Sequence, residues 1–381
     1  MAAESHLNYN LKEISSAFLI KGEVEYVVPY GSGHINDTFR IKNAQKDQPD
    51  YLLQRINRYV FTNPPALIDN INLVTLHIRE KLKGVNGFNP DTETLTLIPA
   101  QNNLFYHLDG AGNYWRMYYF LKDTNSYDIV TTYNQAYQGG KAFGRFQACL
   151  SDMDAALLVE TIPDFHNIEK RMEKLKQVII DNPLNRVSEL DEQLRFVFAR
   201  EEKMKTILIL GRNGQLPVRI THNDTKFNNV LLDQNDQAQC VIDLDTVMPG
   251  YVAYDFGDAI RSSANTAAED EKELDKIDVN LEIFKAFTAG YLKETHVFLT
   301  GNEITSLTLG ALLLPFLVGL RFLTDYIEGD KYFKINTPGH NLQRAKAQFQ
   351  LLKKLEENQD TLNEIVLEEA RKAGMVVTIP Q

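Results

Sequence analysis

The sequence predicts an α+β protein of two lobes, with a strand-rich N-terminal lobe and a mainly helical C-terminal lobe. Three observations lead to this prediction. The chain has 381 residues, which is long for one domain. Its first 120 residues or so have the pattern of short strands with one helix, and the remainder has the pattern of long helices interrupted by one polar hairpin. We place the boundary at the start of the connector Leu121–Ser126, which gives lobes of residues 1–121 and 122–381.

Runs rich in β-branched and aromatic residues predict strands in the N-terminal lobe. Glycine-containing turns follow the first strand and precede the last one, the latter at Asp109–Asn113. One helix is expected at residues 63–82, because Pro64 and Pro65 lie near its start and apolar residues recur at helical spacing. The expected strands are Val24–Tyr30, Asp37–Ile41, Asp50–Ile56, Thr94–Ala100, Leu104–Gly110 and Tyr114–Leu121.

Helical periodicity dominates the C-terminal lobe over residues 132–158, over residues 168–210 and from Leu281 onward. The apolar stretch Leu307–Phe322 is shorter than the roughly 20 residues of a membrane span. It also contains glycine, proline and arginine, and we expect a buried core helix there.

The composition narrows the class of protein. An apolar fraction of 44% and a charged fraction of 24% are typical of a folded soluble chain. The net charge of -11 argues against nucleic-acid or anionic-membrane partners. Cys149 and Cys240 form no ligand cluster, and Cys240 is expected to be a buried, inert thiol. The first ten residues lack a signal-peptide pattern, so a cytoplasmic location is expected.

The most informative stretch runs from Thr221 to Asp245. Two apolar strands, Asn229–Asp233 and Gln239–Asp243, are joined by a polar turn. Antiparallel pairing would bring Asn229 opposite Asp243 at the open end, and strand alternation would put Asp245 on the face of Asp243. Amide and carboxylate oxygens are the ligands that Mg²⁺ prefers, usually together with water and substrate phosphates. We therefore predict Asn229, Asp243 and, less directly, Asp245 as metal ligands.

Asp224 lies five residues before Asn229 and suits phosphoryl transfer, which needs a carboxylate to orient the acceptor hydroxyl and take its proton. The spacing from His222 through Asp224 and Asn229 to Asp243 resembles the catalytic and metal segments of the protein-kinase-like fold. The alternative is a polar turn whose side chains only cap backbone groups. His222 is expected to organise the loop rather than act as a base.

The string Asp255-Phe256-Gly257 matches the kinase metal motif by its letters. If Asp255 were the metal ligand, the hairpin that lies between it and the catalytic loop would have no role in the site. Position along the chain therefore favours Asp243 as the metal ligand. Asp255 or Asp258 is expected instead to support the catalytic loop by accepting its backbone N–H groups.

The N-terminal lobe offers a phosphate-binding turn. Gly31 and Gly33, on either side of Ser32, could let backbone N–H groups approach phosphates, although such turns are also common in ordinary hairpins. A kinase-like lobe also needs a cation on its third strand. That strand has Arg55, or else Gln54, and no lysine.

The chain resembles the aminoglycoside phosphotransferase and choline kinase superfamily, and more narrowly the bacterial N-acetylhexosamine 1-kinases. The strings that carry this resemblance span both lobes: GSGHINDTFRI, YLLQRIN, THNDTKFNNVLLD, VIDLDTVMPG, YDFGDAIR and GLRFLTDYIEGDKYF. Of these, THNDTKFNNVLLD and VIDLDTVMPG suggest the sugar 1-kinase branch.

The resemblance implies an ATP- and Mg²⁺-dependent kinase that phosphorylates the anomeric hydroxyl of N-acetylglucosamine or N-acetylgalactosamine. Asp224 would be the base, and the connector at Phe120 and Leu121 would face adenine. With Asp224, the resemblance implies a sugar pocket lined by His34, Arg321 and Tyr332. Structural alternatives are a turn residue for His34, a buried ion pair for Arg321 and ordinary packing for Tyr332.

Other functions stay open at this stage. The acceptor could be another hexose, an amino alcohol or an aminoglycoside, and the acidic composition keeps a cationic acceptor in view. The missing strand lysine suggests a non-catalytic nucleotide- or sugar-binding regulator as a further possibility. Metal-dependent phosphoester hydrolysis is disfavoured because two-metal sites recruit more histidines than this stretch has. A monomer or weak homo-oligomer is expected.

Overall fold

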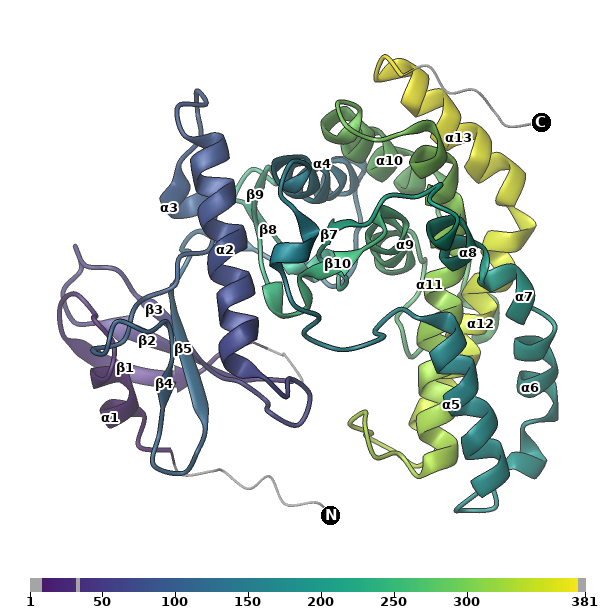
Figure 1. The fold of residues 1–381 in the computed structure, drawn as a ribbon, viewed down its shortest axis with the longest axis horizontal. Coiled ribbons are helices and arrows are strands. Elements are labelled where there is room, and N and C mark those ends of the chain that lie inside the picture. The colour runs from purple at the N-terminus through teal and green to yellow at the C-terminus, as the bar shows by residue number, and fades with distance from the viewer. Residues whose placement is uncertain (1–8, 32–34, 376–381) are drawn as a thin grey trace. The chain divides into compact units, whose positions relative to one another are not determined.

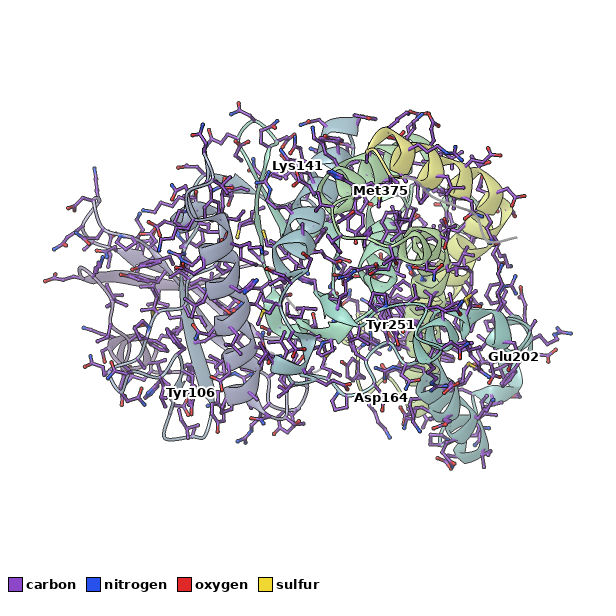
Figure 2. All side chains as sticks on the ribbon, turned by 45° about the horizontal axis from the view of Figure 1, so that its top comes forward. Tyr106, Lys141, Asp164, Glu202, Tyr251 and Met375 are labelled. Atoms are coloured by element: carbon purple, nitrogen blue, oxygen red, sulfur yellow. The ribbon has the colours of Figure 1, made fainter. Side chains whose placement is uncertain are left out.

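The computed structural model describes residues 9–31 and 35–375, and its contacts divide the chain into two compact units, residues 1–122 and 123–381. Each unit has its own arrangement of helices and strands (Figure 1). Unit 1 is an antiparallel sheet with helices, and unit 2 is mostly helical, so the predicted α+β class is confirmed. Side chains fill the space between the elements of each unit (Figure 2).

The sheet of unit 1 has the strand order β1-β2-β3-β5-β4, with every neighbouring pair antiparallel. One face carries an apolar core that includes Ile14 and Phe18, in and just after α1, and Leu53 and Trp115 from the strands. Helix α2 lies on the other side of the sheet (Figure 1). The elements are α1 (Leu11–Ser16), β1 (Val24–Pro29), β2 (Asp37–Asn43), β3 (Tyr51–Arg55), α2 (Pro64–Leu82), α3 (Pro90–Glu93), β4 (His107–Leu108) and β5 (Tyr114–Tyr119).

Two of the expected strands of unit 1 were wrong in extent. Residues 94–100 follow β5 through the bonds Ile98 N to Met117 O (2.8 Å) and Tyr119 N to Thr96 O (3.3 Å), but form only isolated bridges. Pro99 lacks an N–H, which prevents regular pairing there. The strand expected at 104–110 shrinks to the two residues of β4, and the short helix α1 had no periodic signal long enough to find.

Unit 2 is built around α11 (Gly301–Glu328), which packs against α5, α9, α12 and α13. This helix is long and apolar enough to cross a membrane, but 83% of its most apolar window is buried inside the unit. The predicted core helix is therefore confirmed. Its companions are α4 (Tyr133–Leu150), α5 (Ile168–Asp181), α6 (Asp191–Phe198), α7 (Glu201–Met204), α8 (Thr206–Arg212), α9 (Val252–Ser263), α10 (Leu281–Thr295), α12 (His340–Glu357) and α13 (Gln359–Lys372).

The helical stretch expected at residues 168–210 is broken into four helices. Asn182 ends α5 in the left-handed conformation (φ 36°), and Pro183 cannot continue the helix. Because the apolar periodicity resumes on the far side of each break, the sequence pattern alone did not reveal the interruptions.

Two small sheets hold the polar stretch. The predicted hairpin is confirmed: β8 pairs antiparallel with β9, and β6 adds a third strand. A second ribbon pairs β7 with β10. The strands are β6 (Thr124–Asn125), β7 (Arg219–Thr221), β8 (Val230–Asp233), β9 (Ala238–Val241) and β10 (Met248–Gly250).

Candidate active site

Hydrogen bonds join the loop after β7 to the segment before β10. Asn223 adopts a left-handed conformation (φ 64°), which short polar side chains tolerate. Its Nδ2 donates to the carbonyl oxygens of Thr221 (3.1 Å) and Thr246 (3.0 Å). The Thr246 hydroxyl in turn donates to the carbonyl oxygen of His222 at 2.7 Å. These bonds fix the backbone immediately before Asp224.

Asp255 anchors the same loop from α9. Its Oδ2 accepts the N–H of His222 (2.8 Å) and its Oδ1 accepts the N–H of Asn223 (2.7 Å). Gln147 also donates to Oδ2, at 2.6 Å. The expected supporting role is therefore confirmed for Asp255, whereas Asp258 pairs with Arg261 (2.8 Å).

His222 joins this loop to the end of the hairpin. Its Nε2–H donates to the carbonyl oxygen of Ile242 at 2.9 Å, and its Nδ1 accepts the N–H of Asp224 at 3.3 Å. The ring is fully buried and meets Phe143 and Phe146 edge-on. Both ring nitrogens are thus engaged with backbone, which confirms the expected organising role.

Asp224 is partly exposed and lies between a cation and an amide. Lys226 Nζ is 3.2 Å from Asp224 Oδ2, and Asn229 Nδ2 donates to the Asp224 carbonyl oxygen (2.7 Å) and to Oδ2 (3.3 Å). Burial alone would raise the pKa of Asp224, but Lys226 and then His222 hold it below its usual value. The pKa of Lys226 is raised, chiefly by Asp224. Asp224 is therefore an ionised carboxylate with a neighbouring ammonium group.

Asp243 and Asp245 are not related in the way that the sequence predicted, because neither lies in a strand. Strand β9 ends at Val241, Asp243 is left-handed (φ 60°), and Asp245 lies in a short 3₁₀ turn. Strand alternation therefore does not relate the two carboxylates. Asp243 is solvent-accessible but closely surrounded, and desolvation, then the charges of Asp245 and Asp224, raise its pKa to about 6. Asp245 is buried, and its role as a ligand stays a prediction.

These groups suit a hard divalent cation. The Asn229 amide nitrogen is engaged, which leaves its oxygen as the atom offered to a cation. Desolvation and then repulsion from Asp245 and Asp224 raise the pKa of Asp243, and a cation would relieve that repulsion. Over the described part of the chain no three His, Cys, Asp or Glu side chains meet in a metal site. A cation here would need oxygens from a substrate or water as well, as Mg²⁺ usually does.

A guanidinium group surrounded by aromatic rings lies on α11. The Cζ atom of Arg321 is 5.0 Å from the ring centroid of Phe165, 5.7 Å from that of Tyr332 and 5.3 Å from that of Phe333. Within the described residues no carboxylate lies within 4.0 Å of it, so the buried ion pair considered as an alternative is absent there. The structure thus brings two of the predicted sugar-pocket residues, Arg321 and Tyr332, together.

The loop that carries Tyr332 is held by one carboxylate. Asp325 accepts the backbone N–H groups of Lys331 (2.9 Å), Tyr332 (2.8 Å) and Phe333 (2.9 Å). Asn341 also donates to Asp325, at 2.9 Å. The exposed Tyr332 ring is therefore presented by an ordered backbone.

The predicted nucleotide residues of unit 1 are only partly described. Gly31 has φ 79°, a conformation that favours glycine, whereas Ser32, Gly33 and His34 lie outside the described residues. Phe120 stacks beneath Arg40, with Cζ 4.2 Å from its ring centroid, and Leu121 is half-buried. All these assignments stay predictions.

Arg55 lies on the face of the sheet that packs against α1. Its side chain pairs with Asp37 at 2.6 Å and lies over the ring of Tyr9. The opposite face carries Gln54, whose Oε1 accepts Nε (3.0 Å) and Nη2 (2.8 Å) of the buried Arg116. The role of Arg55 toward phosphates stays a prediction. By strand register, the face that carries Gln54 also carries the cations Arg116 and Arg40.

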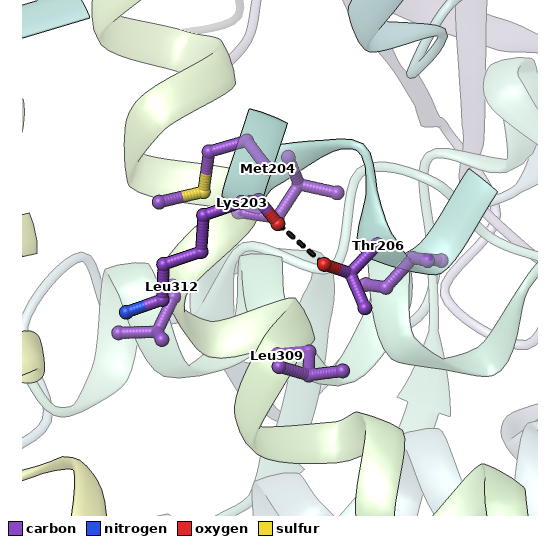
Figure 3. A pocket seen from close by; sticks show the side chains of 7 residues that line it. Lys203, Met204, Thr206, Leu309 and Leu312 are labelled. Carbon is purple, nitrogen blue, oxygen red and sulfur yellow. Dashed lines mark hydrogen bonds between the residues drawn. The ribbon is translucent and has the colours of Figure 1, made fainter. Parts of the chain in front are cut away.

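Sequence reasoning passed over two cations near the loop. The Lys226 signal was available, because a lysine two residues after the base lies within reach of it. Arg171, on α5, donates to the carbonyl oxygen of Phe165 (2.9 Å), and the next residue, His166, donates to the carbonyl oxygen of Asn223. Its place in a helical pattern shows nothing about these contacts. One small hollow between α7, α8 and α11, lined by apolar side chains such as Met204 and Leu312, contains no predicted site residue (Figure 3).

Solved structures share this architecture at low sequence identity. An aminoglycoside phosphotransferase from Alicyclobacillus acidocaldarius matches 96% of this chain and 99% of its own at 12% identity, with a TM-score of 0.63. A choline kinase from Cryptosporidium parvum matches 91% and 93% at 14% identity (TM-score 0.58). The amicoumacin kinase hAmiN, solved with AMP-PNP and Ca²⁺, matches 96% and 94% at 11% identity (TM-score 0.56). These similarities establish the predicted protein-kinase-like fold.

The sequence itself gives the family. Residues 27–278, which hold strands β2 to β5 of unit 1, the loop at Asp224 and the anchoring helix α9, match the model of the phosphotransferase enzyme family. Since the match covers more than half of the chain, the protein belongs to the phosphotransferase enzyme family.

Proposed function

We propose that the protein is an ATP- and Mg²⁺-dependent kinase that transfers the γ-phosphoryl group to the anomeric hydroxyl of an N-acetylhexosamine. The observation that carries the proposal is the ionised Asp224 on a doubly anchored loop, next to the oxygens of Asn229 and Asp243. Family membership supports phosphoryl transfer as the reaction class.

Each group has a defined task in such a transfer. Asp224 would orient the acceptor hydroxyl and take its proton as the oxygen attacks phosphorus. The Lys226 ammonium group, 3.2 Å from that carboxylate, would stabilise negative charge on the transferred phosphoryl group. Asn229 and Asp243 would hold Mg²⁺, which supplies charge neutralisation at the phosphates.

The surroundings of Arg321 support a sugar acceptor. Aromatic rings and a guanidinium group offer apolar faces and N–H donors, which suit a ring with hydroxyl and acetamido groups. The narrow resemblance to N-acetylhexosamine 1-kinases adds the 1-position. Under this proposal Arg321 and Tyr332 line the sugar pocket, and unit 1 binds the nucleotide through the Gly31 turn and the connector.

A second candidate is a kinase of the same fold with another acceptor. The similarity to solved aminoglycoside and choline kinases favours it at the level of the fold. A non-catalytic binding protein is less well supported, because it would have no chemical need for Asp224, Asn229 and Asp243 together.

The test is phosphorus and proton NMR of the protein with ATP, Mg²⁺ and a panel of hexoses, N-acetylhexosamines, amino alcohols and aminoglycosides. The expected product is a sugar 1-phosphate, stable to alkali and labile to acid. Asp224→Asn should lose most of kcat while keeping nucleotide affinity, because a base acts mainly in the transition state. Asp360→Asn, an exposed change in α13, is the matched control. Normal turnover by Asp224→Asn, or a product phosphorylated elsewhere, would contradict the proposal.

A further inference from the structure

Two guanidinium groups lie beside the catalytic loop. His166 Nε2–H donates to the carbonyl oxygen of Asn223, the residue before Asp224, at 3.1 Å. The preceding residue, Phe165, accepts Nε (3.2 Å) and Nη2 (2.9 Å) of Arg171 at its carbonyl oxygen. Its ring is the one that lies 5.0 Å from Arg321. Phe165 therefore brings Arg171 and Arg321 together next to the loop that carries Asp224.

The protein does not balance these two charges. Among residues 9–31 and 35–375, no carboxylate oxygen lies within 4.0 Å of either guanidinium group. Asp164, marked in Figure 2, acts on Arg171 only through space and accepts the Asn167 amide at 2.8 Å. Two guanidinium groups without a carboxylate partner in the described chain therefore lie near the segment that precedes Asp224.

The two arginines affect each other and the neighbouring His166. Burial and then the charge of Arg321 lower the pKa of Arg171 to about 10. Burial lowers the pKa of His166 to about 3, with the Asn223 hydrogen bond opposing and Arg321 and Arg171 contributing further. His166 is therefore neutral and serves as a backbone donor, so the positive charge belongs to the arginines alone.

Some N–H donors of the two arginines have no protein acceptor among the described residues. Arg171 uses Nε and Nη2 for Phe165, which leaves Nη1, and no protein acceptor is found for Arg321 within the described chain. Guanidinium N–H groups bind carbonyl, hydroxyl or carboxylate oxygens and repel an ammonium group. Kinases for cationic acceptors would need acidic groups at this place instead.

We propose that Arg171 and Arg321 act as a guanidinium pair that binds an oxygen-bearing group of the acceptor and excludes acceptors with an ammonium group. The inference rests on the proposed function and adds Arg171 as a specificity-determining residue. It places the substrate among uncharged or anionic sugars rather than among amino sugars or amino alcohols.

The experiment compares two acceptors that differ only in one acyl group. Full-length protein with ATP and Mg²⁺ is assayed on N-acetylglucosamine and on glucosamine, at a pH where the glucosamine amine is protonated. The ratio of kcat/KM for the two sugars is expected to be large in the wild type and to fall at least about ten-fold in Arg171→Gln. Arg171→Lys keeps the charge and should keep most of the exclusion. Lys174→Gln, one turn along α5, removes a cation already paired with Glu328 and should leave the ratio unchanged.

The outcomes separate the two ideas. If N-acetylglucosamine is turned over but Arg171→Gln leaves the ratio unchanged, or lowers both rates equally, the guanidinium pair is refuted and the function stands. If both sugars are inert but another uncharged or anionic acceptor is used with the same sensitivity to Arg171→Gln, only the sugar assignment fails. Preferred turnover of a cationic amino alcohol or aminoglycoside would overturn both.

Discussion

Replacing Asp255 by asparagine should loosen the catalytic loop without altering any group that faces substrate. The two carboxylate oxygens divide their work: Oδ2 accepts from His222 N and Gln147 Nε2, and Oδ1 accepts from Asn223 N. An asparagine has one acceptor oxygen, so it can keep only one of these two positions. Its amide group would then point its own N–H at a backbone N–H.

The expected cost follows from this geometry. Asp255 is 1% exposed, so the lost charge-assisted bond (about 1.5–3 kcal/mol) and the unsatisfied donor (about 1–3 kcal/mol) both count. Neutralising the carboxylate offsets part of this loss in stability, because burial disfavours the charged form of Asp255 and is the largest influence that raises its pKa. We expect a net loss of about 2 kcal/mol in the free energy of unfolding. A shift of about 1 Å at Asp224 would also lower kcat by about 10²-fold.

Two optical probes make the assay specific. Urea denaturation followed by far-ultraviolet circular dichroism reports mainly the helices of unit 2, and the single tryptophan, Trp115, reports the core of unit 1. Asp255→Asn should shift the first transition and spare the second. Asp233→Asn is the matched control, because one oxygen of Asp233 accepts both of its backbone N–H groups (Asn235 and Gln237), and asparagine can keep both. Equal transitions for the two variants would refute the reasoning.

Three further predictions concern other parts of unit 2. Lys226→Met should lower kcat by about 10²-fold with little change in the KM for ATP, whereas the exposed control Lys46→Met should not, as steady-state kinetics would show. Gly140→Ala should destabilise the protein by about 1–3 kcal/mol, because the added methyl group would collide with a backbone carbonyl of α10. The control Gly301→Ala, whose methyl group would meet nothing within 4 Å, should change thermal stability by less than about 0.5 kcal/mol. Since the folded pKa of His166 lies at about 3 against 6.5 unfolded, stability should fall as pH drops from about 6.5 toward 3, by at most about 1.4 kcal/mol per pH unit. The variant His166→Gln should lose that component in denaturation series at several pH values, and an unchanged slope would contradict it.

The hairpin and the loop before it could be predicted because their signals are local. Alternating apolar residues on either side of a polar turn specify β8 and β9, and the spacing from His222 to Asn229 lies within one loop. The role of Asp255 was also accessible, since a buried acid near a loop has few uses other than accepting N–H groups. By contrast, the bend that removes Asp243 from the strand depends on a left-handed residue, which the alternating pattern cannot show.

The guanidinium pair could not be predicted, because it depends on contacts between distant segments. Arg171 lies in α5 and Arg321 in α11, and Phe165 joins them only once α5 packs along α11. Arg171 alone has the pattern of an ordinary residue on the surface of a helix, and Arg321 was expected in the sugar pocket only from the resemblance. Only the folded arrangement shows that the acids near them are engaged elsewhere.

The residues Asp255-Phe256-Gly257 match the kinase metal motif in sequence but have structural roles in this protein. Asp255 accepts loop N–H groups, the fully buried Phe256 packs against rings of α10, and Gly257 lets α9 approach α11 so closely that a methyl group would strike the Gly310 carbonyl. All three demands come from helix packing and loop anchoring, and none concerns a metal. In a metal motif the aspartate must reach the nucleotide phosphates, which a 1%-exposed side chain committed to three donors cannot do. The substitutions therefore separate by mechanism: Asp255→Asn should lower stability and kcat together, whereas Asp243→Asn should weaken the Mg²⁺ dependence of turnover while sparing stability.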